Sequence, residues 1–88
     1  MKKRVHAYFS GQVQGVFLRA TIQKQAQKLG ITGWVKNLKD GRVELIVEGE
    51  EEMLKNAIEF CKKYTKITAE EISWEKFKGE FVEFKILN

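Results

Sequence analysis

A short loop with two glycines, followed by an arginine, is the first part of this sequence that could do chemistry. Gly11 and Gly15 lie in a segment that runs to Leu18, and Arg19 comes directly after it. Glycine permits the positive φ angles with which backbone N–H groups converge on one point, and the dipole of a helix that begins there favours an anion. The segment therefore indicates an anion-binding loop, while loops of this kind are also common where they only make a turn.

Arg19 has two interpretations. Its guanidinium could offer a planar fork to two phosphate oxygens, or it could be a solvated side chain in the first helical turn. The helix dipole disfavours a cation at a helix N-terminus unless an anion offsets it, and this favours the first interpretation.

Asn37 is the second candidate, near the end of a predicted strand over residues 32–38. Side chains alternate between the two faces of a strand, so Asn37 shares a face with Val35 and points to the helices if Val35 does. The Asp40-Gly41 pair that follows predicts a hairpin turn. From the residues alone, an Asn that shapes this turn is the more common case, and an Asn beside the anion loop is the alternative.

His6 is the only histidine. By strand parity its side chain lies on the face opposite Val5, with Arg4 and Tyr8. We therefore expect no catalytic role for it.

Patterns along the chain predict the elements that carry these residues. Period-two alternation predicts strands, and apolar residues at helical spacing predict two helices. The first helix stops at Gly30, and the second begins with three glutamates and ends with two lysines, as the helix dipole favours. In chain order the predicted elements are a strand over 4–10, a helix over about 19–30, strands over 32–38 and 43–49, a helix over about 50–63, and strands over 72–77 and 82–86 joined near Gly79.

This order of elements is typical of the split βαβ arrangement, here with a short fifth strand. We expect a ferredoxin-like α/β sandwich of the α+β class, with an antiparallel sheet covered on one face by two helices. The 88 residues predict a single domain over 1–88, because a second core would not fit.

Composition narrows the class of protein. No apolar run approaches the roughly 20 residues that span a bilayer, and the first residues lack the apolar stretch of a signal peptide, so the sequence predicts a soluble, cytoplasmic protein. Cys61 is the only cysteine, which excludes disulfide scaffolds, zinc ribbons and iron–sulfur sites. A net charge of +4 is compatible with an anionic partner, either nucleic acid or a small phosphate. Lys and Glu dominate the charges, as they do both in thermophilic proteins and in ordinary helices.

Two blocks of this sequence resemble the acylphosphatase family. The first is Gly11-Gln12-Val13-Gln14-Gly15-Val16-Phe17-Leu18-Arg19, which resembles the signature Gly-x-Val-Gln-Gly-Val-x-aromatic-Arg. The second is Gly33-Trp34-Val35-Lys36-Asn37, followed by Asp40-Gly41-x-Val43-Glu44 and Glu48-Gly49. The blocks keep the family's order and spacing. Leu18 departs from the pattern, because the family usually has Phe or Tyr there.

The resemblance implies an enzyme that hydrolyses an acyl phosphate to a carboxylate and inorganic phosphate, without a metal or cofactor. It implies that Arg19 neutralises the phosphoryl oxygens and that Asn37 positions the attacking water. The oxygens would be held by the backbone amides of Gln14, Gly15, Val16, Phe17, Leu18 and Arg19. Inorganic phosphate and sulfate would compete with the substrate. We further expect a monomer without membrane association.

A nucleic-acid-binding module of the RNA-recognition type is the competing interpretation, because that fold has the same order of elements and this chain is basic. The run Lys78 to Phe84 resembles the RNP1 motif of that fold. It lacks one residue after its glycine, lies on the last strand instead of the third, and carries Glu80 and Glu83 where a phosphate backbone would pass. Nucleic acid is therefore not the expected partner.

Overall fold

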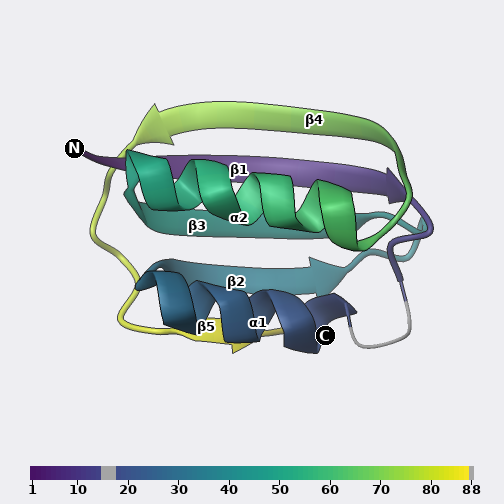
Figure 1. Ribbon diagram of the computed structural model, residues 1–88, viewed down its shortest axis with the longest axis horizontal. Coiled ribbons are helices and arrows are strands. Elements are labelled where there is room, and N and C mark those ends of the chain that lie inside the picture. Colours follow the sequence, from purple (N-terminus) through teal and green to yellow (C-terminus); the bar gives the residue numbers. More distant parts are fainter. Residues whose placement is uncertain (15–17, 88) are drawn as a thin grey trace.

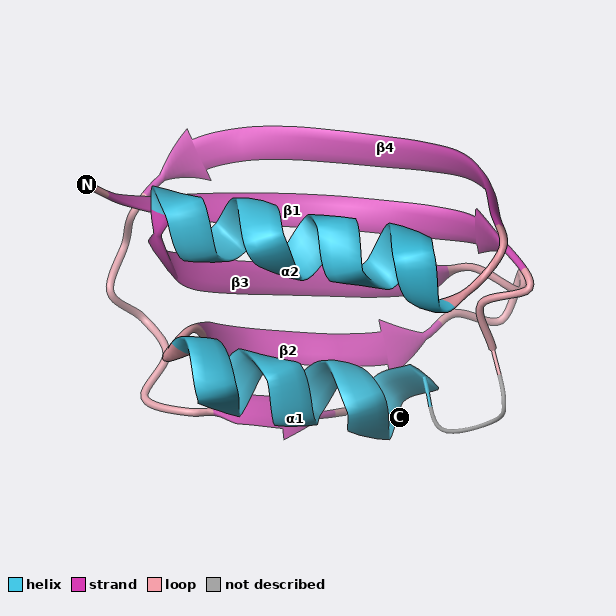
Figure 2. Cartoon of the chain, in the orientation of Figure 1, coloured by secondary structure: helices cyan, strands magenta, loops and turns pink. Residues whose placement is uncertain are grey.

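The structure is a computed structural model that describes residues 1–14 and 18–87. Two helices lie on one face of a five-stranded sheet (Figures 1 and 2). The elements in chain order are β1 (Lys2–Gly11), α1 (Leu18–Leu29), β2 (Thr32–Asn37), β3 (Val43–Glu50), α2 (Glu51–Tyr64), β4 (Ile67–Lys76) and β5 (Phe84–Ile86). The ferredoxin-like prediction is confirmed, and the predicted element boundaries differ from these mainly in the last two strands.

The strand order is β4-β1-β3-β2-β5. β1 is antiparallel to both β3 and β4, and β2 is antiparallel to β3. β5 is parallel to β2, so the sheet is mixed, whereas the sequence predicts an antiparallel sheet. The last two strands are also not neighbours, because β4 and β5 occupy opposite edges.

The parallel pair follows from the path of the chain. β4 runs in the direction opposite to β2, since the pairs β4–β1, β1–β3 and β3–β2 are each antiparallel. Residues 77–83 then cross one end of the sheet, and the chain returns along the other edge (Figure 1). A strand that reverses the direction of β4 must run with β2.

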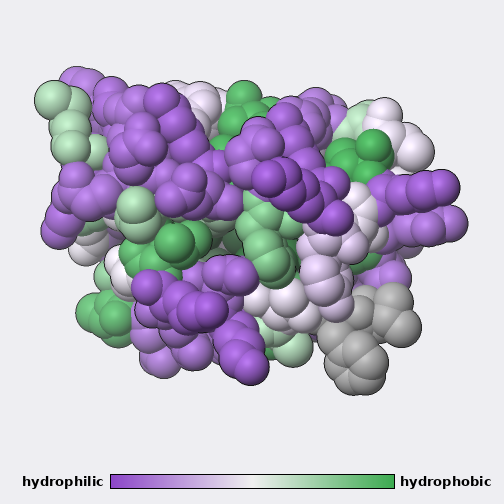
Figure 3. Space-filling model, in the orientation of Figure 1, coloured by the Kyte–Doolittle hydropathy of each residue, from purple (hydrophilic) through white to green (hydrophobic). Residues whose placement is uncertain are grey.

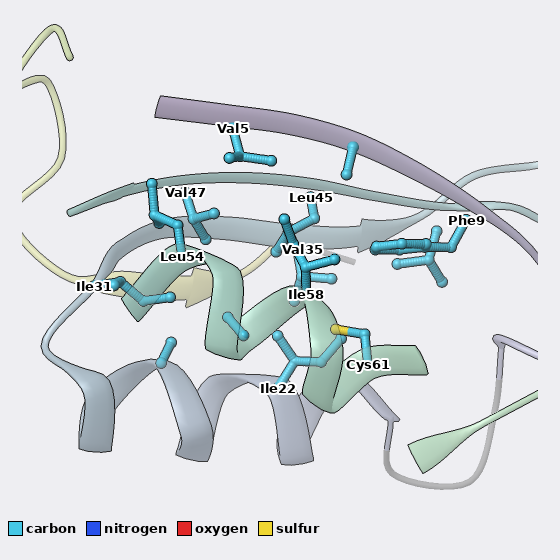
Figure 4. Close-up of a cluster of buried hydrophobic side chains, with 14 of the residues drawn as sticks. Val5, Phe9, Ile22, Ile31, Val35, Leu45, Val47, Leu54, Ile58 and Cys61 are labelled. Carbon is cyan, nitrogen blue, oxygen red and sulfur yellow. The ribbon is translucent and has the colours of Figure 1, made fainter. Parts of the chain in front are cut away.

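The hydrophobic core fills the space between the sheet and the two helices (Figure 4). β1 contributes side chains from alternate positions, as period-two alternation predicts. The helices contribute the stripes Leu18, Ile22 and Ala26 of α1 and Leu54, Ala57, Ile58 and Cys61 of α2. The outward faces of both helices are mostly hydrophilic (Figure 3). No helix in the described ranges is long and apolar enough to span a membrane.

A buried carboxylate holds the connection between β4 and β5. The Glu48 side chain is fully buried and accepts hydrogen bonds from the backbone N–H groups of Lys78, at 2.7 Å, and Glu80, at 3.3 Å. Arg4 Nη1 lies 3.2 Å from Glu48 Oε2 and also pairs with Glu80, while Arg4 Nε donates to Glu75. Burial alone would raise the pKa of Glu48, but these donors hold that pKa below the ordinary value.

Candidate active site

The two candidate segments lie at the same end of the molecule. β1 and β2 both finish there, and α1 begins there, at the right of Figure 1. β1 and β2 run in the same direction because each is antiparallel to β3, so their last residues lie at the same end of the sheet. The fold therefore brings the loop after β1 to the turn after β2.

The first part of the loop is fixed to the connection between α2 and β4. Gly11 has φ 123°, and a Cβ on it would lie 2.4 Å from the Lys66 carbonyl oxygen, so only glycine fits. The Gln12 N–H donates to that oxygen at 2.9 Å, and the Thr65 hydroxyl donates to the Gln12 carbonyl. Val13 is buried in the core. These contacts give the loop a fixed starting point.

Gln14 joins the loop to the turn between β2 and β3. Its Nε2 donates to the carbonyl oxygens of Leu38, at 2.7 Å, and Arg42, at 2.8 Å. We had assigned only the backbone amide of Gln14 to the site. The side-chain partners are 24 and 28 residues away along the chain, so no local pattern could have indicated them. The predicted phosphate-binding residues Gly15, Val16 and Phe17 lie outside the described residues.

Leu18 and Arg19 are the first two residues of α1. The Leu18 side chain is buried in the core, where it starts the apolar stripe of α1. The first N–H groups of a helix have no acceptor within the helix, so both backbone amides point out of its N-terminus. The amides of Leu18 and Arg19, which the sequence assigns to phosphate binding, are thus at the N-terminal end of α1.

The Arg19 side chain is partly exposed. No carboxylate within residues 1–14 and 18–87 forms an ion pair with it. One turn further along α1, Gln23 Nε2 donates to the Phe84 carbonyl of β5 at 3.1 Å. Residues four apart share a face of a helix, so Arg19 lies on the side of α1 that faces the β2–β5 edge.

Asn37 ends β2, where it pairs with Val43 of β3. Val35 is fully buried beneath the helices, so parity directs Asn37 to the same side, as the sequence predicts. The Asn37 Oδ1 atom is buried and has no hydrogen-bond partner among the described residues. A buried acceptor without a partner is rare in proteins and calls for an explanation such as a bound water or ligand.

The turn after Asn37 is held by other groups. The Leu38 N–H donates to the Arg42 carbonyl at 2.8 Å, and the Gly41 N–H donates to the Leu38 carbonyl at 3.2 Å. Asp40 accepts hydrogen bonds from the backbone and the guanidinium of Arg42. The predicted hairpin is confirmed, and none of these bonds uses the Asn37 side chain.

Other reactive side chains lie away from this end or are inert. His6 lies on the open face of the sheet, opposite the helices, with its Nε2 2.6 Å from Glu44 Oε2. Cys61 is buried on the core-facing side of α2, and burial raises the pKa of its thiol to about 12. Within residues 1–14 and 18–87, no cluster of three or more His, Cys, Asp or Glu is placed to hold a metal ion.

The two aromatic rings of the segment that resembles RNP1 make contacts within the chain. Phe84 is buried in the core as the first residue of β5, and the Arg4 guanidinium lies over the Phe81 ring, 5.3 Å from its centre. Phe84 is therefore not exposed for base stacking, and Phe81 already has a cation over its ring.

Known proteins resemble this chain in both sequence and fold. A family model described as acylphosphatase matches residues 5–86. An acylphosphatase of Syntrophobacter fumaroxidans is 46% identical over 88 residues, which cover 97% of this chain and 91% of the relative. An acylphosphatase of Caldanaerobacter subterraneus subsp. tengcongensis is 43% identical over 89 residues, and the match covers 98% of this chain and 99% of the relative. The crystal structure of acylphosphatase from Bacillus subtilis has a TM-score of 0.91 at 33% identity and covers 100% of both chains. With a match of this extent in both sequence and structure, the chain belongs to the acylphosphatase family.

Proposed function

We propose that this acylphosphatase cleaves the carboxyl–phosphate bond of small acyl phosphates at the end of the molecule where β1 and β2 finish. The backbone amides of residues 14–19 and the Arg19 guanidinium hold the phosphoryl group, and Asn37 positions the attacking water. The observation that carries this proposal is the buried Asn37 Oδ1, which faces the helix side of the sheet and has no partner among the described residues.

The chemistry needs few protein groups. The oxygen of water attacks phosphorus, the bond from phosphorus to the acyl oxygen breaks, and the carboxylate leaves with the electron pair of that bond. One proton of the water passes to a phosphoryl oxygen, so the second product is dihydrogen phosphate. A carboxylate is a good leaving group and needs little or no general acid. Positioning of the water and stabilisation of charge on the phosphoryl oxygens can therefore supply much of the catalysis.

Each proposed group suits its task. The Asn37 carboxamide oxygen can accept a hydrogen bond from water, which directs a lone pair of the water toward phosphorus. Arg19 presents two parallel N–H donors to two phosphoryl oxygens. The bound phosphate would also offset the unfavourable position of a cation at a helix N-terminus. No metal ion or cofactor has a task in this scheme.

The proposal extends to the properties predicted from the sequence. One domain over residues 1–88, a monomeric state and a cytoplasmic location stay predictions. Inorganic phosphate and sulfate are expected to compete with the substrate, since the same loop amides and Arg19 would hold any compact tetrahedral oxyanion. A nucleic acid is not favoured as the partner, because the rings of Phe81 and Phe84 already pack within the chain.

Release of phosphate from benzoyl phosphate tests the proposal. The purified protein should hydrolyse it in the presence of EDTA, added magnesium should not raise the rate, and inorganic phosphate should raise the apparent KM without lowering kcat. A nucleic-acid module would instead bind oligonucleotides with a strong dependence on salt concentration. Absence of phosphate release, or loss of activity on chelation that a divalent cation restores, would overturn the proposal.

A further inference from the structure

We infer that Gln14 is a positioning residue for this hydrolysis, acting through its side chain to hold Asn37 in place relative to the phosphate-binding loop. The inference rests on the proposed function, because it assigns Gln14 a task toward Asn37. It concerns the side-chain carboxamide and is separate from the part that the Gln14 backbone amide would play in binding phosphate.

The Gln14 side chain bonds to both residues that flank the β2–β3 turn. The two N–H donors of the Gln14 carboxamide reach the carbonyl oxygens of Leu38 and Arg42, at 2.7 and 2.8 Å. Leu38 and Arg42 are also the two residues that bond to each other across the turn. A carboxamide suits this position, since it provides two donors in a fixed fork without bringing a charge to the phosphate site.

The bonded residues flank Asn37 on both strands. Leu38 follows Asn37 directly in the chain, and Arg42 directly precedes Val43, which is the ladder partner of Asn37. The Asn37 Oδ1 atom bonds to no described residue, so its location depends on the backbone that carries it. That backbone is held by the β2–β3 ladder on one side and by Gln14 on the other.

The loop does not need the Gln14 side chain to stay attached to the protein. Gly11, Gln12 and Val13 already fix its start, through a close backbone approach, the bond from the Gln12 N–H to Lys66 and burial of Val13. What the Gln14 side chain adds is the placement of the turn that carries Asn37 relative to the loop. Its hydrogen bonds are exposed to solvent, so they contribute little to global stability.

The test is a double-mutant cycle between Gln14→Ala and Asn37→Ala, measured with benzoyl phosphate. Gln14→Ala should lower kcat by about 10-fold or more, because a displacement of about 1 Å at a reacting group can cost about 100-fold. KM and the inhibition constant of inorganic phosphate should change by less than about threefold, since the cradle itself is intact. In the Asn37→Ala background, the same Gln14 substitution should change kcat by less than about twofold.

Two further variants control the cycle. Gln27→Ala removes an exposed glutamine of α1 whose side chain makes no hydrogen bond to the described residues, and it should retain wild-type kcat. Gln14→Glu keeps the length of the side chain but replaces Nε2, which carries both N–H donors, with an oxygen that faces the two carbonyl oxygens, so its loss of kcat should be at least as large as that of Gln14→Ala. Urea unfolding of each variant shows whether it is folded. If Gln14→Ala does not fold, Gln14→Glu takes its place in the double-mutant cycle.

Three results would overturn the inference. An unchanged kcat in the Gln14 variants, while Asn37→Ala is impaired, removes the role of Gln14 and leaves the proposed function standing. An equal loss of kcat in both backgrounds means that Gln14 acts independently of Asn37. If Asn37→Ala itself retains wild-type kcat, the proposed function fails at Asn37 and the inference fails with it.

Discussion

The two ends of this molecule differ in whether their buried polar groups have hydrogen-bond partners. At the Glu48 end, which comprises Glu48, residues 77–83 and the start of α2, the buried carboxylate receives donors from Arg4 and two backbone amides. At the site end, which comprises residues 11–14, the start of α1 and the turn after β2, the buried Asn37 Oδ1 has no partner among the described residues.

The two helix starts differ in the same sense. α2 begins at the Glu48 end with Glu51 and Glu52 in its first turn, where the helix dipole favours negative charge. α1 begins at the site end with no acid in its first turn and with the cation Arg19 instead. The buried carboxylate of Glu48 thus has its partners within the protein, while Asn37 Oδ1 and the Arg19 guanidinium have none among the described residues. We propose that a water and an anion use this free bonding capacity. Substitutions at the two ends should therefore separate stability from catalysis.

The largest effect is expected from Arg19→Lys. Lys keeps the charge but loses the planar fork, so kcat/KM should fall by about 30- to 1000-fold, or about 2 to 4 kcal/mol of transition-state stabilisation. The melting temperature should remain near that of the wild type. Arg42→Lys is the matched control, because the Arg42 guanidinium stacks on Tyr8 and pairs with Asp40, and it should stay active. An Arg19→Lys variant with more than half of wild-type activity would remove Arg19 from the mechanism.

Asn37→Ala should give the next largest effect. Loss of the oriented water should lower kcat by about 10- to 100-fold, with a small change in the inhibition constant of phosphate. Stability should change little, because the Asn37 side chain makes none of the hydrogen bonds that hold the turn. Steady-state kinetics and urea unfolding on the same sample check both halves. Early unfolding with a normal kcat would show instead that Asn37 is a turn residue.

Glu48→Gln should produce the reverse pattern. The substitution removes the buried charge that faces Arg4 and replaces one acceptor with a donor, so the free energy of unfolding should fall by roughly 1 to 3 kcal/mol. Folded enzyme should keep its kcat, because Glu48 lies at the opposite end from the site. Loss of kcat without loss of stability in this variant would mean that the two ends are coupled.

Acid should weaken the Glu48 end. The pKa of Glu48 is lower in the folded protein than its ordinary value, so its contribution to stability is fully present above the unfolded-state pKa of about 4.3 and is lost as the pH falls through the folded-state pKa. Urea unfolding at a series of pH values should show wild-type stability declining below about pH 5. The decline should be shallower in Glu48→Gln. Parallel curves for the two proteins would exclude Glu48 as a source of the pH dependence.

The smallest effect belongs to the start of α2. Replacing Glu51 and Glu52 together with Gln removes the charges that the helix dipole favours and should cost about 0.5 to 1 kcal/mol at low ionic strength. The cost should shrink as salt is added, because exposed charges are screened. Activity should not change. Differential unfolding in low and high salt measures the effect, and a loss that salt does not reduce would point to a cause other than the dipole.

Local patterns in the sequence were enough to predict much of this protein. The alternation of β1 predicted that His6 lies on the face opposite Val5, and the structure confirms it, with Val5 fully buried in the core. Two glycines and an arginine at the start of a helix, with an Asn at the end of a strand, indicated where a phosphate site should lie. The prediction for β1 is confirmed because side-chain direction within a strand depends only on positions a few residues apart. The phosphate site stays a prediction.

Contacts between distant parts of the chain were decided by the tertiary structure. The parallel pairing of β5 with β2 depends on the crossing of residues 77–83, and Glu48 fixes that crossing through amides 30 and 32 residues away. The hydrogen bonds from Gln14 to Leu38 and Arg42 likewise form only because β1 and β2 finish at the same end of the sheet. A polar side chain can find its partner only after the strands take their order and register, so its spacing in the sequence carries no signal of the bond. The sequence alone determined the elements and the candidate residues, and the order of the strands determined that Gln14 meets the turn that follows Asn37.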